Sequence, residues 1–153
     1  MMACLLQHDL RLGQPPLVTV VLRHDMPDGS YHFDWMLACS AAQPAALIAF
    51  HLDRPLDQVE EGQTLSAQRI KDHRPMYLDF EGPLSGDRGF VRRVATGTVL
   101  ACSPARQPQE LCLGIRWCNG NHCGVVQDIH MVRDDVTNWR INCVRNRRSI
   151  QAE

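Results

Sequence analysis

Residues 23–37 read RHDMPDGSYHFDWML, and this stretch decides the fold class. In its second half, polar and apolar side chains alternate, so a β-strand there places His32 and Asp34 on one face and the aromatic side chains on the other. The residues PDG at positions 27–29 are typical of a tight turn between two strands. The stretch therefore predicts a β-hairpin, with the apolar run just before it as the first strand.

This hairpin also predicts a cluster of metal-binding groups. His24 ends the first strand and faces back toward the second, so His24, His32 and Asp34 converge on one cation. Two imidazoles and one carboxylate suit manganese, ferrous iron or zinc better than magnesium or calcium, which prefer oxygen ligands alone. The alternative interpretation is that these are surface or hydrogen-bonded strand residues without a metal.

The rest of the chain repeats the pattern of short strands. Apolar or alternating segments follow one another with turn residues between them, which indicates a mainly β protein with little helix, a compact closed or nearly closed β-barrel of about eight strands. Residues 53–68 are the one expected helical or irregular insertion, because Leu56, Val59 and Leu65 stand near helical spacing. The expected strands are 17–22, 31–39, 46–52, 69–77, 90–100, 111–117, 125–132 and 139–144.

Composition narrows the class of protein. A chain of 153 residues, 44% hydrophobic and 22% charged, suits one domain over residues 1–153, with mobile ends at 1–13 and 146–153. The net charge of -1 gives no sign of a polyanionic partner. However, 15 of the 16 basic residues are Arg, whose guanidinium binds phosphate and carboxylate groups well, so this composition favours an anionic ligand. The alternative explanation for the excess of Arg is genomic base composition. Seven cysteines without framework spacing indicate a reducing compartment, and no segment predicts a signal peptide or membrane span. We expect a cytoplasmic protein without a membrane partner.

A second chemically active segment is residues 71–82, KDHRPMYLDFEG. In an extended chain His73 and Tyr77 share a face, so both point at one substrate group. An imidazole can protonate a phosphoryl oxygen and a phenol can donate a hydrogen bond to it. The alternative interpretation is a strand with a polar edge.

The two segments together resemble the 3′-phosphoesterase domain of bacterial DNA ligase D. The pattern of that family runs approximately His-Asp, four residues, His-Tyr-Asp-Phe-Arg, and then Glu-Asp-His-Pro-Leu-Asp-Tyr-Ala-Asp-Phe-Glu-Gly. This chain is most similar to the small stand-alone members, and the similarity extends from about Val18 to Gly97.

The resemblance implies a metal-dependent hydrolase of DNA repair. Its expected fold is a compact β-barrel, its expected cofactor Mn²⁺ or another divalent transition metal, and its expected reaction the removal of a 3′-terminal ribonucleoside or 3′-phosphate from nucleic acid. Expected partners are nucleic-acid 3′ ends and a DNA ligase or polymerase. By position, His24, His32 and Asp34 match the metal ligands, while His73 and Tyr77 match the residues that contact the reacting phosphate.

This chain departs from the family pattern at several positions. The first segment is two residues longer, Met36 stands where the family has a phosphate-binding Arg, and Leu22 and Lys71 replace a Gln and a Glu. Arg54 corresponds to a family Lys. We therefore expect phosphate contacts from other arginines, namely Arg54, Arg69 and Arg74.

Two other functions fit the same residues. One is a module that binds nucleic-acid ends or a ligase partner after losing catalytic groups, which Met36 and Leu22 permit. The other is an iron-dependent oxygenase, in which His32 and Asp34 combine with a distant histidine such as His130 as a facial triad.

Overall fold

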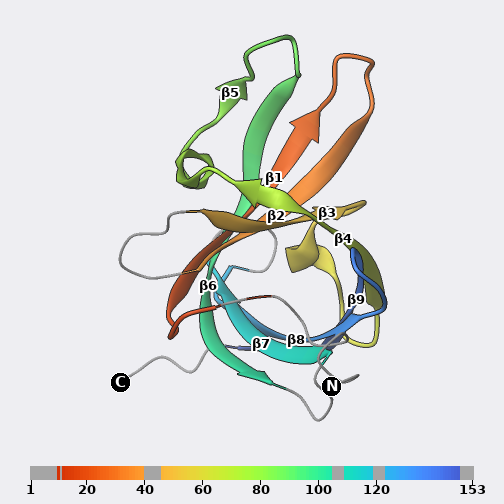
Figure 1. The fold of residues 1–153 in the computed structure, drawn as a ribbon. Coiled ribbons are helices and arrows are strands. Elements are labelled where there is room, and N and C mark those ends of the chain that lie inside the picture. The colour runs from red at the N-terminus through yellow and green to blue at the C-terminus, as the bar shows by residue number, and fades with distance from the viewer. Residues whose placement is uncertain (1–9, 11, 40–45, 105–108, 119–122, 149–153) are drawn as a thin grey trace.

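The computed structural model describes residues 10, 12–39, 46–104, 109–118 and 123–148. Their strands form a single antiparallel sheet in the order β1-β2-β3-β4-β9-β8-β7-β6-β5, and β6 also pairs with β1. Eight strands thus close into a ring, with the two-residue β5 added outside it (Figure 1). The strands are β1 (Leu17–Asp25), β2 (Tyr31–Ala38), β3 (Leu47–Leu52), β4 (Thr64–His73), β5 (Gly82–Pro83), β6 (Phe90–Pro104), β7 (Glu110–Trp117), β8 (Val125–Arg133) and β9 (Asn138–Arg148).

The predicted fold class is confirmed: the protein is mainly β, and its ring of eight strands fits a closed or nearly closed β architecture. Two short 3₁₀ turns, η2 (Leu56–Gln58) and η3 (Pro75–Leu78), are the helical elements of the described residues. The β1–β2 turn and the β5–β6 turn project together beyond one end of the ring (Figure 1). In the described part of the chain, no helix is long and apolar enough to cross a lipid bilayer.

Two sequence expectations about elements are wrong. Residues 53–68 are an insertion only in their first half, because β4 begins at Thr64 with Leu65 and Ala67 buried on its inner face. Residues 69–77 are not extended throughout, because β4 ends at His73 and η3 follows. Pro75 stands at the start of that turn, where its fixed φ favours helical geometry.

The sheet carries apolar clusters on both of its faces. The larger fills the ring and includes Trp35, Phe50 and Trp139. The smaller lies on the outer face of β1, β2 and β3, and we call it the outer cluster; its members are Val20, Leu22, Met36, Ala38, Leu47, Ala49, Tyr77 and Val91. Residues 74–84, which include η3, cover this outer face, since Tyr77 is a buried member of the cluster and Leu78, Phe80 and Leu84 pack against it.

Buried polar contacts fix the elements that join the strands. The Gln127 side chain on β8 accepts a hydrogen bond from Trp117 Nε1 and donates to the carbonyl oxygens of Leu56 and Val59, so η2 is tied to the ring. At the other end of the chain, residues 146–148 lie in β9 and pair with β8, whereas we expected a mobile end there. Residues 1–9, 11 and 149–153 of the expected mobile ends lie outside the described residues.

Candidate metal centre

Strand register brings four side chains with potential metal-ligand atoms together on the outer face of the sheet. His24 on β1 is directly opposite His32 on β2, and Asp34 on β2 is directly opposite His51 on β3. Side chains of directly paired residues stand on the same face about 5 Å apart, so the four form a compact group. The group adjoins the outer cluster, because Leu22 and Met36 are neighbours of these residues on β1 and β2.

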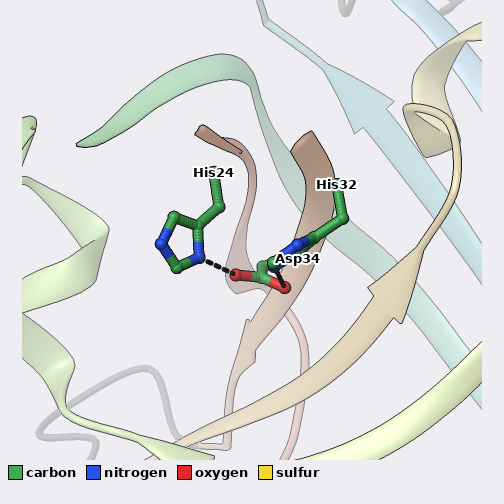
Figure 2. Close-up of side chains that lie close together, drawn as sticks. All are labelled: His24, His32 and Asp34. Carbon is green, nitrogen blue, oxygen red and sulfur yellow. Dashed lines mark ion pairs between the residues drawn. The ribbon is translucent and has the colours of Figure 1, made fainter. Parts of the chain in front are cut away.

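The Asp34 carboxylate is the centre of this group, as Figure 2 shows for two of its neighbours. Its Oδ2 oxygen lies 3.9 Å from His24 Nδ1, and its Oδ1 oxygen lies 3.3 Å from His32 Nε2 and 3.8 Å from His51 Nδ1. Asp34 is only 4% exposed, and no hydrogen bond among the described residues reaches its buried Oδ1 oxygen. A buried carboxylate is costly without compensation, and a cation would supply it.

The ring orientation of His24 suits a metal ligand. His24 Nε2 lies 2.7 Å from the carbonyl oxygen of Arg88, and since a carbonyl only accepts, Nε2 carries the proton. The other nitrogen, Nδ1, is then unprotonated in the neutral ring and faces Asp34. A backbone carbonyl that fixes the tautomer is the usual support for a metal-binding histidine.

Three of the four residues offer ligand atoms close enough together that small side-chain shifts would let them hold one cation. One ligand atom from each of His24, His32 and Asp34, the three residues expected as ligands, lies within 4.8 Å of the others; we call these three residues the metal group. This donor set of two imidazoles and one carboxylate is typical of manganese, iron or zinc and does not choose among them.

His51 is the residue that sequence reasoning missed. Its ring stacks on that of His32, with 3.8 Å between centroids and 25° between planes, and contacts Asp34 as described. Burial lowers the pKa of His51, as do the neighbouring His32 and His24, while Asp34 opposes them. The neutral ring is therefore favoured. A metal lies in the plane of a ligating imidazole, so two stacked rings do not share one ion as placed, and His51 borders the metal group rather than completing it.

His73 and Tyr77 lie together but apart from the metal group. Their rings are in edge contact at 5.6 Å, although η3 rather than an extended chain brings them together. His73 is opposite Leu47 at the start of β3, whereas His51 is four residues later, roughly 13 Å along the strand. No hydrogen bond or ion pair among the described residues joins the two groups, and the apolar outer cluster lies between them.

The three arginines expected at phosphate have different surroundings. The Arg69 guanidinium donates hydrogen bonds to Asp72 and to the carbonyl oxygens of Ala49 and Ile70. It also lies over the Phe50 ring, which faces the inside of the sheet. This placement does not support a contact with phosphate. Arg54 donates to the Thr64 carbonyl oxygen at 3.3 Å, and Arg74 is exposed. None of the three contacts the metal group in the described part of the protein.

His130 does not belong to the metal group, so the oxygenase triad built on it is wrong. It lies on β8, where its Nε2 is 2.9 Å from Glu110 Oε1, while the described neighbours of His32 and Asp34 are His24 and His51.

Met36, at the position where the resembled sequence pattern has an arginine, lies in an apolar environment. It is 1% exposed within the outer cluster, and Leu22 is buried beside it. The outer face between the metal group and His73 is therefore apolar.

Comparison with known proteins adds no family assignment: no protein-family model matches the chain, and no curated protein matches it either.

Proposed function

We propose that this protein is a metal-dependent phosphoesterase that processes the 3′ ends of nucleic acid, with Mn²⁺ as the preferred cofactor. The observation that carries the proposal is the buried Asp34 carboxylate, which faces the imidazoles of His24 and His32 and has an oxygen that receives no hydrogen bond from any described residue. The order of the two sequence segments, which resembles the 3′-phosphoesterase domain of DNA ligase D, supports the choice of reaction.

His24, His32 and Asp34 would hold the cation, and the Arg88 carbonyl would keep the His24 ring in its ligating orientation. A bound divalent ion polarises phosphoryl oxygens and lowers the pKa of bound water. The same three residues would fix where the scissile phosphate lies. Because they stand on neighbouring strands of one sheet, that position would be rigid.

The resemblance assigns His73 and Tyr77 to the reacting phosphate, but His73 is opposite Leu47, four residues from His51 on β3, so we propose that they donate hydrogen bonds to a second phosphate of the substrate. Their contact with each other supports a joint role, since one would orient the other. The separation along β3 means that a substrate reaching both groups would span the outer cluster. DNA repair, a ligase or polymerase partner and a cytoplasmic location remain predictions from the sequence.

The buried Met36 favours a second candidate, a module that binds 3′ ends without cutting them. An Arg–phosphate fork contributes much of the affinity and charge stabilisation in phosphoryl chemistry, and the described residues place no equivalent beside Asp34. Reintroducing Arg at position 36 is not a clean test, because the substitution would bury a guanidinium among apolar side chains.

The proposal is tested with purified protein, Mn²⁺ and a labelled primer-template that ends in a 3′-ribonucleotide or a 3′-phosphate. We expect wild type to process at least one of these ends under nitrogen as well as in air, and His32→Ala and His73→Ala to lose that activity. Mn²⁺ binding is measured in parallel by calorimetry, where His32→Ala should lose affinity and His73→Ala should keep it.

His130→Ala is the matched control, because this histidine pairs with Glu110 on another strand. It should retain both activity and metal affinity. Intact ends with every divalent metal, together with retained binding of the primer-template, would replace the phosphoesterase by the binding module. Activity that required oxygen and ferrous iron would replace it by an oxygenase.

A further inference from the structure

A groove lined mostly by polar residues begins at His51, beside the metal group, and runs across β3, β4 and β9. Its cavity measures about 310 Å³, and His51 lies in its wall. His51 also contacts Asp34, so a single side chain borders both the groove and the metal group. Whatever lies in the groove is therefore adjacent to what is bound at the metal.

The strand register makes this connection continuous. Asp34 is opposite His51, His51 is opposite Gln68 on β4, and Gln68 is opposite Asn138 on β9. Cross-strand partners project from the same face, so the four polar side chains form one row. The row spans three strand spacings, roughly 14 Å, which accommodates the sugar and base of one nucleoside beyond the metal group.

The charges of the groove argue against a phosphate as its occupant. Arg140 is the cation of the lining, and its Nε donates to both carboxylate oxygens of Asp134 at 3.0 and 2.9 Å. Asp53 forms no ion pair within the described residues, so the groove carries a surplus negative charge. A phosphate would be repelled, whereas hydroxyl and amino groups that donate hydrogen bonds would be accepted.

Gln68 and Asp53 are groove residues with unused hydrogen-bonding capacity, and Ser66 is another. The side chains of Gln68 and Asp53 are exposed and engage in no hydrogen bond in the described part of the chain. The Asn138 amide nitrogen, by contrast, already donates to Asp135. Gln68 and Asp53 are thus able to select a ligand through hydrogen bonds.

We propose that this groove is the binding site for the terminal ribonucleoside of the substrate, with Gln68 and Asp53 as the residues that determine specificity. The inference rests on the proposed function and deepens it: of the two expected 3′ ends, the groove favours the ribonucleoside end over the phosphate end. Asp53 accepts a hydrogen bond from a ribose hydroxyl, and Gln68 bonds to the sugar or base. Neither residue is a catalytic residue.

The test measures binding by fluorescence anisotropy in Mn²⁺. One labelled DNA duplex ends in a 3′-ribonucleotide joined through a phosphorothioate, which slows hydrolysis, and the second ends in a 3′-phosphorothioate alone. Wild type should bind the ribonucleoside end at least about 5-fold more tightly, as expected for one or two hydrogen bonds. Gln68→Ala and, independently, Asp53→Asn should reduce that preference several-fold without changing affinity for the other end.

Gln58→Ala is the matched control, because Gln58 is an exposed glutamine on η2 outside the groove. It should keep the wild-type preference. Equal binding of both ends by wild type, or an unchanged preference in both groove variants, would overturn the proposal. If the protein prefers the ribonucleoside end but hydrolyses neither end, the groove proposal is supported and the phosphoesterase proposal is refuted. If the protein hydrolyses an end but binds both ends equally, the phosphoesterase proposal is supported and the groove proposal is refuted.

Discussion

Asp34 is the residue whose surroundings most constrain the function. Its buried carboxylate lies among imidazoles, and a neutral amide of the same shape would remove the negative charge that attracts a cation. We expect Asp34→Asn to lower Mn²⁺ affinity by more than about 100-fold, because losing a residue that only hydrogen-bonds to a metal ligand already costs about 10–100-fold. Calorimetric titration with Mn²⁺ measures the effect.

Asp79→Asn is the control for this substitution, because Asp79 is exposed and lies on the segment that covers the outer cluster rather than in the metal group. It should bind Mn²⁺ as wild type does. Equal affinity in Asp34→Asn and wild type would exclude Asp34 as a ligand and leave its burial unexplained.

The sequence predicts the three residues of the metal group because they are close together in the chain, but it does not predict the neighbouring His51. His24, His32 and Asp34 belong to one hairpin, so alternation and a turn signal suffice to place them on one face. His51 comes from the next strand, and its position opposite Asp34 depends on the β2–β3 register, which lies beyond local patterns. The one local signal is that His51 is the single polar residue of the apolar strand 47–52, where it shares a face with Leu47 and Ala49.

At the scale of elements, the β5–β6 turn supports the metal group through its backbone. Gly89 has a φ of +98°, and a Cβ there would overlap with the Asp25 carbonyl oxygen. We expect Gly89→Ala to shift the turn, withdraw the Arg88 carbonyl from His24, and lower the free energy of unfolding by about 1–3 kcal/mol. Urea denaturation measures the stability, and calorimetry should show weaker Mn²⁺ binding.

Gly86→Ala is the control that shows whether the effect of Gly89→Ala comes from the steric overlap with Asp25 or from the positive φ of the replaced glycine. Gly86 lies in the same turn with a φ of +72°, but the nearest atom to its added Cβ is Arg88 Nε at 3.9 Å. This variant should lose some stability and keep its metal affinity. The same loss of metal affinity in both variants would show that the overlap at Gly89 is not the cause.

The β8–β9 hairpin carries a pH-dependent contribution to stability. Burial tends to raise the pKa of Asp128, but hydrogen bonds from Arg147 and Arg145 outweigh it and hold the pKa below the ordinary 3.8. A lowered carboxylate pKa stabilises the folded state above pH 3.8, and the stabilisation disappears as the pH falls below it. We expect Asp128→Asn to lower the free energy of unfolding by about 1 kcal/mol at pH 7, because both arginines are largely exposed.

Urea unfolding of wild type and Asp128→Asn over a range of pH tests this expectation. The difference in the free energy of unfolding should be constant above pH 5 and shrink below 3.8. If the difference in the free energy of unfolding does not depend on pH, it arises from packing rather than from the charge of Asp128.

The boundaries of the strands can be predicted from the sequence where only one pattern, either strand alternation or helical spacing, is present. The eight strands follow from alternation and turn residues, but β4 begins five residues before its expected start, because Leu56, Val59 and Leu65 imitate helical spacing there. The break after His73 had a local signal in Pro75, yet the covering of the outer cluster by η3 is a tertiary contact. Local patterns therefore place the strands, and packing decides where they end.

For the whole molecule, closure of the ring predicts an order of backbone stability. β1 pairs with β2 on one side and with β6 on the other along nearly its full length, whereas β5 adds two residues to β6 alone. We expect amide hydrogens of β1 to exchange at least about 1000-fold more slowly than those of residues 84–89, because β1 opens only when the ring opens. Hydrogen exchange followed by mass spectrometry or NMR measures this, and comparable rates would contradict closure at β1–β6.

The two apolar faces of β1, β2 and β3 have a consequence for how this sequence can diverge. In β2 both faces are buried from Phe33 to Ala38, whereas β9 alternates strictly between buried and exposed positions from Asn138 to Arg140. A strand that is covered on both sides has almost no position that tolerates a charged residue, whereas a half-exposed strand tolerates substitution at every second residue. Over evolutionary time β1–β3 should therefore accumulate substitutions slowly and the β8–β9 hairpin quickly, so that distant relatives would retain the half of the ring that carries the metal group.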